Sequence, residues 1–190
     1  MHDGAGLATA LDLALPPVAR ALGHAQGVRG RIEVVPTPGT DFTVLIDYAH
    51  TPDGLENVLQ AVRGFCRGRV VAVFGCGGDR DRQKRPIMGK IGVDLADYVV
   101  FTSDNPRSEA PEAILQDMLA GVGETDTPYA VIPDRREAIG YSLDQARPGD
   151  VILLAGKGHE TYQETGGVKR HLDEREEVAA WLARRRKEVT

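Results

Sequence analysis

The chain has 190 residues, of which 42% are hydrophobic and 27% charged, and this ordinary globular composition excludes a disordered or fibrous class. Its net charge of -5 argues against a general nucleic-acid-binding surface, and its two cysteines form neither a disulfide framework nor a zinc-binding pattern. No apolar run approaches the roughly 20 residues that cross a bilayer, and the chain does not begin with the basic-then-apolar order of a secretion signal. We therefore expect a soluble cytoplasmic protein.

The first forty residues predict a small helical segment. Three leucines spaced four apart share one helical face that ends at a Pro-Pro pair: Leu7, Leu11 and Leu15. A second short helix is predicted from Pro17 to Leu22, and Pro36 to Gly39 has the composition of a linker. Because this piece lacks a core of its own, we interpret residues 1–41 as the end of another domain.

From Phe42 onward, short apolar runs alternate with stretches of helical pattern. The runs are nearly continuous and rich in β-branched residues, which is typical of strands buried on both faces; they are Phe42–Ile46, Val70–Phe74, Tyr98–Thr102, Tyr129–Ile132 and Val151–Ala155. The predicted helices begin at proline, lysine or aspartate; they are Pro52–Cys66, Lys84–Leu95, Pro111–Gly121, Asp134–Ala146 and Asp173–Arg185. This alternation predicts an α/β, doubly wound domain with a mostly parallel sheet over residues 42–190.

Polar and glycine-rich segments follow four of the predicted strands. They are Asp47–Pro52, Gly75–Arg82, Asp104–Arg107 and Gly156–Glu160. Ligands of parallel sheets bind outside the carboxyl ends of the strands, so these four segments predict one cleft. Independent turns would distribute similar residues over both edges of the sheet.

Each of these residues also has a purely structural interpretation, which the sequence leaves open. His50 could cap or pack, Asp47 could be a helix N-cap, and Lys157 could be a surface lysine between two glycines. The basic residues within 80–85 could form a solvated helix face. Cys76 is interpreted as a small packed side chain, because nothing nearby marks it as a nucleophile.

The residue types at the predicted cleft suit a zwitterionic ligand. Arg80 and Arg107 can each bind a carboxylate through two parallel hydrogen bonds. Asp104 and Glu160 can accept hydrogen bonds from an ammonium group, and Asn105 can donate or accept. A ligand with two carboxylates and two amines would use all of them. The sequence contains neither a G-x-x-x-x-G-K-[ST] nor a G-x-G-x-x-G phosphate-binding motif, so it offers neither standard cradle for a nucleotide.

Several strings of the sequence resemble the C-terminal domain of the Mur ligases, from about Gly30 to Trp181. The strings are DYAHTPDGLENVL at Asp47–Leu59, FGCGGDRD at Phe74–Asp81, KRPIMG at Lys84–Gly89, AGKGHETYQ at Ala155–Gln163 and DNPR at Asp104–Arg107. The last of these is similar to the version that selects meso-diaminopimelate. The resemblance implies a Rossmann-like, amino-acid-binding domain over 42–190, with residues 1–41 as the tail and linker of a central ATP-binding domain.

The resemblance also implies which residues bind each ligand. It assigns the meso-diaminopimelate site to Arg80, Asp104, Asn105, Arg107, Gly156 and Glu160. Arg107 would bind the second carboxylate, which lysine lacks. Arg31, Asp47 and His50 match positions near the nucleotide, with Asp47 at its ribose, and Lys84 and Arg85 would face the same junction.

The activity that the resemblance implies is ATP-dependent amide-bond formation, which adds meso-diaminopimelate to UDP-MurNAc-L-Ala-D-Glu in peptidoglycan synthesis. All of its partners are small molecules, without nucleic acid or membrane. The family places the phosphate loop and the Mg²⁺ ligands in domains that these 190 residues do not include. We therefore expect this chain alone to lack ligase activity and to bind ATP very weakly. The alternative is a non-catalytic amino-acid-binding module or an inactive remnant of such a ligase.

Overall fold

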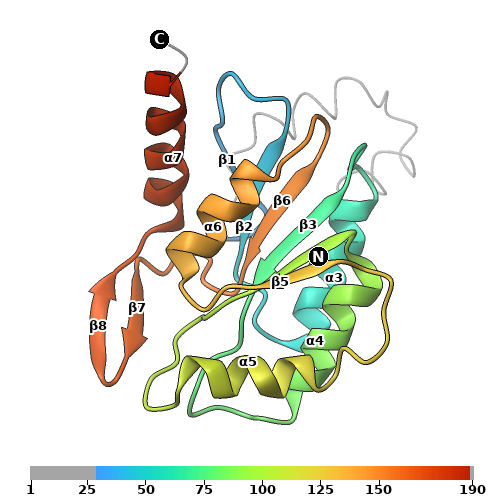
Figure 1. Ribbon diagram of the computed structural model, residues 1–190, viewed down its shortest axis with the longest axis vertical. Helices are drawn as coiled ribbons and strands as arrows, with labels where there is room; N and C mark the ends of the chain where they lie inside the picture. Colours follow the sequence, from blue (N-terminus) through green and yellow to red (C-terminus); the bar gives the residue numbers. More distant parts are fainter. Residues whose placement is uncertain (1–28, 189–190) are drawn as a thin grey trace, which may run out of the picture.

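The protein was analysed as a computed structural model, which describes residues 29–188. Its centre is a six-stranded sheet in the order β1-β2-β6-β3-β4-β5, with helices on both faces (Figure 1). The strands are β1 (Glu33–Val35), β2 (Thr43–Asp47), β3 (Val70–Phe74), β4 (Tyr98–Phe101), β5 (Tyr129–Val131) and β6 (Val151–Ala155). The helices are α3 (Pro52–Arg63), α4 (Lys84–Leu95), α5 (Pro111–Leu119), α6 (Arg135–Asp144) and α7 (Glu174–Glu188). All neighbouring strands are parallel except β1 and β2, so the predicted fold is confirmed.

Strand β1 was not predicted, and it changes the interpretation of the residues before Phe42. Glu33 lies opposite Ile46, and β1 runs antiparallel to β2 along one edge of the sheet. The expected linker from Pro36 to Gly39 is the turn between these two strands, where Gly39 takes a φ of 83°. The sheet therefore begins before residue 42. β1 supplies hydrogen-bond partners to the backbone of β2, which would otherwise be the edge strand. The helices predicted within residues 7–22 lie outside the described residues.

Two further departures concern the other edge of the sheet and the segment before α7. Tyr129 and Val131 of β5 are exposed, so the expectation that this strand is buried on both faces is wrong. The reason is that β5 is the last strand and pairs only with β4. An unpredicted hairpin, β7 (Tyr162–Thr165) and β8 (Val168–His171), turns at Gly166-Gly167, and both of these glycines have positive φ.

Two hydrophobic layers hold the helices against the sheet. On one face, α3, α4 and α5 contribute residues such as Leu59, Met88 and Met118, all fully buried. On the other face, α6 and α7 contribute Ile139 and Trp181 (Figure 1). Every residue of β3 and β6 is buried, as expected of central strands covered on both sides.

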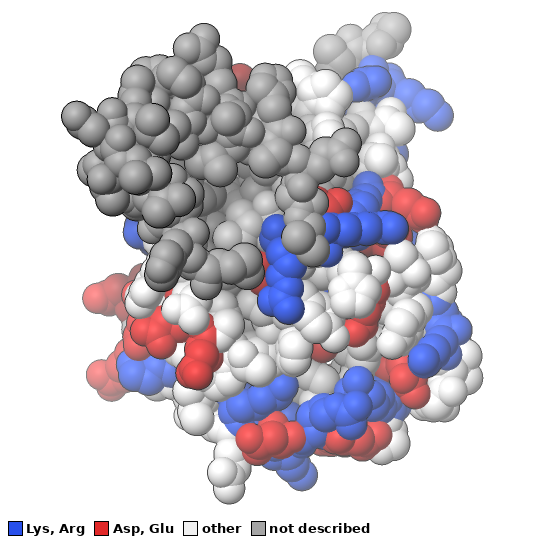
Figure 2. Space-filling model, turned by 180° about the vertical axis from the view of Figure 1, so that it is seen from behind, with Lys and Arg blue, Asp and Glu red and all other residues white. Residues whose placement is uncertain are grey.

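The surface of the described residues is mixed in charge. On the face seen in Figure 2, Lys and Arg side chains are interleaved with Asp and Glu side chains. Among the helices within residues 29–188, none combines the length and apolar character needed to cross a bilayer.

A buried guanidinium joins the strand ends to the helices of one face. Arg135, at the start of α6, is fully buried and donates from Nε to Glu174 Oε1 at 2.9 Å. Its Nη1 donates to the carbonyl of Ser103 at 3.1 Å, and its Nη2 to the carbonyl of Ala155 at 2.9 Å. These carbonyls lie at the carboxyl ends of β4 and β6, so Arg135 holds the two strand ends against the first turns of α6 and α7.

We predict that Arg135→Met lowers the free energy of unfolding by about 3–5 kcal/mol, because it leaves the buried Glu174 carboxylate without its cation. Chemical denaturation at neutral pH measures this change. The control is Lys90→Met, which breaks an exposed ion pair with Asp94 on α4 and should cost less than about 0.5 kcal/mol. Equal effects of the two substitutions would contradict the role given to Arg135.

Candidate functional site

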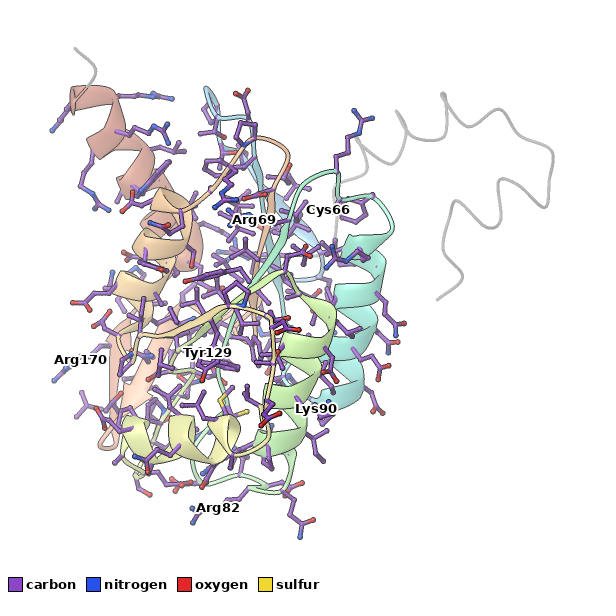
Figure 3. All side chains as sticks on the ribbon, turned by 45° about the vertical axis from the view of Figure 1, so that its right-hand side comes forward. Cys66, Arg69, Arg82, Lys90, Tyr129 and Arg170 are labelled. Carbon is purple, nitrogen blue, oxygen red and sulfur yellow. The ribbon has the colours of Figure 1, made fainter. Side chains whose placement is uncertain are left out.

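The four polar segments that follow strands β2, β3, β4 and β6 meet in one pocket of about 550 Å³, as the sequence predicts. The pocket lies at the carboxyl edge of the sheet. Figure 3 shows Arg82 at this edge and Arg69, which directly precedes β3, toward the opposite one. The pocket is lined by Tyr48, His50, Thr51, Pro52, Gly77, Arg80, Asp81, Gln83, Lys84, Ile87, Asp104, Asn105, Arg107, Gly156 and Glu160.

All six residues expected to bind the amino acid line this pocket. Three of them form one acidic wall: Asp104, Asn105 and Glu160. Asn105 Nδ2 donates to Glu160 Oε2 at 2.9 Å, and Tyr48 reaches the other carboxylate oxygen of Glu160 at 3.5 Å. Two carboxylates with an amide between them form a surface that accepts hydrogen bonds from an ammonium group. Glu160 is also the main reason, after burial itself, that the pKa of Tyr48 is raised.

Arg107 provides the opposite charge and is held in an unusual backbone conformation. Its φ of 54° lies in the left-handed region, which is costly for a long side chain. Two backbone hydrogen bonds with the β7–β8 hairpin hold it there: Arg107 N donates to the Glu164 carbonyl at 2.9 Å, and Gly166 N donates to the Arg107 carbonyl at 2.6 Å. The guanidinium donates from Nη1 to the Gly78 carbonyl at 2.7 Å, which sets its direction in the pocket.

The same hairpin orders the rest of the segment after β4. Gln163 Nε2 donates to the Asp104 carbonyl at 2.8 Å, and Glu164 N donates to Asn105 Oδ1 at 3.0 Å. The sequence analysis missed this hairpin, although Gly166-Gly167 between two short runs is a hairpin signal. The residues of the expected specificity motif thus depend on a neighbour more than fifty positions later in the chain.

Arg80 and Lys84 come from the segment after β3 and from the start of α4. Arg80 is exposed and donates from Nη1 to the carbonyl of Asp79 at 3.0 Å. Asp79 has a φ of 52° and accepts from the Ser108 hydroxyl at 2.6 Å, a hydrogen bond that lowers the pKa of Asp79. Lys84 Nζ donates to the carbonyl of His50 at 2.8 Å and joins the β2 and β3 segments across the pocket rim.

Arg85 contradicts two expectations, since it belongs neither to a solvated helix face nor to an exposed domain junction. It is fully buried and binds Glu109 in a bidentate manner at 2.7 and 2.9 Å, and Asp117 at 2.9 Å. It also donates to the Gly77 carbonyl at 3.3 Å. The reason is the helical register, because position 85 of α4 faces α5 while Lys84 faces the pocket. Arg85 therefore supports the pocket from beneath.

The three residues expected near a nucleotide gather at the end of β2, but they differ in access. His50 lines the pocket, and its ring centroid lies 4.6 Å from that of Tyr48. Arg31 places its guanidinium 5.6 Å from the same Tyr48 ring. Asp47 is buried outside the lining, and its two carboxylate oxygens accept from the backbone N–H groups of Ile32 and Ala49, both at 2.8 Å.

The alternative roles of Asp47 and Lys157 are both wrong. The N-cap of α3 is Thr51, which accepts from Gly54 N, and Asp47 instead anchors the end of β2 to the segment before β1. Lys157 is no surface lysine, because it is fully buried behind the acidic wall. No signal in the local sequence distinguishes a buried lysine between glycines from an exposed one.

Cys76 is a packed side chain, as expected. It is buried, lies 3.6 Å from the Met88 sulfur, and burial raises the pKa of its thiol to about 12, so the thiolate is strongly disfavoured. Among residues 29–188, no group of three or more His, Cys, Asp and Glu side chains is arranged to hold a metal ion.

Comparison with known proteins assigns the chain to a family. Residues 30–158 match the family described as "Mur ligase, glutamate ligase domain", which is more than half of the chain. The chain belongs to the Mur ligase family. Its neighbours among solved structures include a UDP-N-acetylmuramoyl-L-alanyl-D-glutamate–2,6-diaminopimelate ligase, with a TM-score of 0.81 and 40% identity, covering 95% of this chain and 37% of that one.

Curated relatives of this Mur ligase chain carry the same name as that structure. The ligase from Trichormus variabilis is 55% identical over 185 residues, which cover 97% of this chain and 37% of the relative. The ligase from Geobacillus thermodenitrificans is 53% identical over 177 residues, or 93% of this chain and 36% of the relative. The chain thus spans little more than a third of these relatives. A UDP-N-acetylmuramate-alanine ligase from Thermotoga maritima has a TM-score of 0.58 at 24% identity over 96% of this chain and 36% of its own, and shares the fold.

We predict that the support given by Arg85 to this Mur ligase pocket is lost in acid. Hydrogen bonds from Arg85, and then from Asp79 N, lower the pKa of Glu109 from 4.5 to about 2. A carboxyl whose folded pKa is lowered stabilises the fold fully above its unfolded pKa, and this stabilisation is lost as the pH falls toward the folded value. The difference in unfolding free energy between wild type and Glu109→Gln should therefore be constant above about pH 5.5 and shrink as the pH falls from about 4.5 toward 2.

Urea denaturation across this pH range measures the difference. The control is Glu124→Gln, in the exposed loop before β5. The unfolding free energy of this variant should differ little from that of wild type at every pH. A Glu109→Gln difference that stays constant down to about pH 3 would contradict the ion-pair explanation.

Proposed function

We propose that this pocket binds meso-diaminopimelate, and that the chain is the amino-acid-binding part of a ligase that adds it to UDP-MurNAc-L-Ala-D-Glu. The observation that supports this best is the arrangement of the pocket, where Arg80 and Arg107 lie in the same cavity as an acidic wall. Meso-diaminopimelate has two carboxylates and two ammonium groups. The pocket thus offers partners of opposite sign to both kinds of charge on the ligand.

The two arginines are held differently, and this difference suggests their roles. The backbone of Arg107 is fixed by the hairpin and its guanidinium by the Gly78 carbonyl, so it suits recognition of a carboxylate at one defined place. Arg80 is exposed at the pocket mouth and bonds only locally, to the carbonyl of Asp79. We assign the distal carboxylate of the ligand to Arg107 and the carboxylate beside the reacting amine to Arg80.

The reaction requires ATP, which transfers a phosphoryl group to the D-glutamate carboxylate and leaves as ADP. The amine of diaminopimelate then attacks the acyl phosphate, the amide bond forms, and inorganic phosphate and a proton are released. The residues of this chain contribute by positioning the amine donor, an effect that can supply a large part of a rate enhancement. Arg31, Asp47 and His50, which gather at the end of β2, are the candidates for contact with the nucleotide, and Lys84 donates to the His50 carbonyl beside them. Mg²⁺ would neutralise the charge on the phosphates of the nucleotide.

Such a ligase would act in the cytoplasm, where ATP and the UDP-linked substrate are both present.

We predict that Arg107→Ala in the ligase that contains this chain removes most of its preference for meso-diaminopimelate over lysine. The two amino acids differ by the distal carboxylate, and a guanidinium left without that carboxylate in the occupied pocket costs up to several kcal/mol, which corresponds to roughly a thousandfold discrimination. The substitution should raise the KM for diaminopimelate steeply and leave the KM values for ATP and the UDP-linked substrate nearly unchanged. The measurement is kcat/KM for the two amino acids.

Arg80→Ala is the matched comparison, because it removes a guanidinium from the same pocket. We expect it to lower kcat/KM for diaminopimelate and for lysine to a similar extent, since both amino acids carry the carboxylate beside the reacting amine. An unchanged diaminopimelate-to-lysine ratio in Arg107→Ala would exclude Arg107 as the specificity residue. Undetectable ligation of either amino acid by the wild-type ligase would overturn the proposed function itself.

A further inference from the structure

The acidic wall of the pocket has a buried cation directly behind it. Lys157 lies between β6 and Glu160, is fully buried, and does not line the pocket. Its Nζ lies 3.0 Å from Asn105 Oδ1, 3.5 Å from Asp104 Oδ1 and 3.5 Å from Glu160 Oε2. One ammonium group therefore contacts all three side chains that form the wall.

We propose that Lys157 is a positioning residue that sets the charge of this wall, so that the wall accepts one ammonium group of the amino-acid substrate. The inference rests on the proposed function and adds a residue that does not touch the ligand. Asp104 and Glu160 together carry two negative charges, and Lys157 offsets one of them. The remaining single negative charge matches a single ammonium group in the pocket.

The contacts of Asn105 show that Lys157 also orients the wall. Asn105 Oδ1 receives Lys157 Nζ and Glu164 N, both at 3.0 Å, so its Nδ2 must point to Glu160. Neither oxygen of Glu160 can turn away without losing the contact with Asn105, Lys157 or Tyr48. Lys157, Asn105 and Tyr48 thereby fix the position of the Glu160 carboxylate.

Four charged groups surround Lys157: Asp104, Glu160, Arg135 and Glu174. Burial lowers the pKa of Lys157, while Asp104 and Glu160 oppose this change. Arg135 and Glu174 also face it, from α6 and α7, but they pair with each other and act in opposite directions. The Tyr162 ring of β7 lies 5.7 Å from Nζ. The two wall carboxylates are thus the anions in direct contact with the Lys157 ammonium group.

A comparison of three proteins tests the charge role. Wild type has a net wall charge of one negative, Glu160→Gln alone has none, and Glu160→Gln with Lys157→Met has one negative again. Gln at position 160 can still accept from Asn105, so the shape of the wall is retained. We expect Glu160→Gln to weaken binding of meso-diaminopimelate to the chain. We expect the double variant, with Lys157→Met added, to bind it about tenfold more tightly than Glu160→Gln does. NMR titration of the 190-residue chain measures the dissociation constants.

Pimelic acid, which has both carboxylates and no amine, is the control ligand. If Lys157 acts through charge, adding Lys157→Met to Glu160→Gln strengthens diaminopimelate binding and does not strengthen pimelate binding. If Lys157 has only a structural role, adding Lys157→Met weakens the binding of both ligands, and that result overturns the inference. If Lys157→Met prevents folding, as judged by circular dichroism, Lys157→Gln replaces it, because a glutamine can still donate to Asn105.

The same titration separates the inference from the proposed function. If the wild-type chain binds no diaminopimelate, that result overturns the proposed function and the inference with it. Wild-type chain that binds diaminopimelate, together with a double variant that binds it less tightly than Glu160→Gln, overturns only the role of Lys157. Recovery of diaminopimelate affinity without recovery of pimelate affinity supports both.

Discussion

The buried pair of Arg135 and Glu174 is the interaction on which the site depends most. Its guanidinium binds the carbonyls of Ser103 and Ala155, the residues that directly precede the acidic wall and the Gly156–Glu160 segment. The Ala155 carbonyl ends β6 and the Ser103 carbonyl follows β4, and a buried carbonyl requires a donor. The arginine supplies these donors, and Glu174 supplies the countercharge that makes its burial tolerable.

A second layer of buried cations supports the pocket in the same manner. Lys157 lies behind the acidic wall, and Arg85 lies beneath the segment that carries Gly77 and Arg80. Each cation bonds to backbone carbonyls or to side chains of pocket segments, and each is paired with carboxylates. The loops of the pocket are therefore anchored by charge-assisted hydrogen bonds, which are about twice as strong as neutral ones. The arrangement leaves Arg80 and Arg107 to line the pocket.

Much of the fold was predictable from local pattern. β3, β6 and α4 begin and end where the apolar runs and helix signals place them, and the other elements predicted from residue 42 onward differ by a few residues at their ends. Central strands buried on both faces leave a strong signal because every position is apolar. The signal fails for β1, β7 and β8, which are short and carry polar or exposed residues. Such strands exist because of the partner they pair with, not because of an apolar pattern of their own.

The sequence by itself determined that four polar segments would meet at one edge, because the carboxyl ends of parallel strands share an edge. It also determined the charge types available to a ligand there. Tertiary structure alone decided that Lys157 and Arg85 are buried supports, that Asp47 is committed to backbone donors, and that a hairpin holds Arg107. The physical reason is that burial and hydrogen-bond partners depend on which segments pack together, and no window of the chain contains that information.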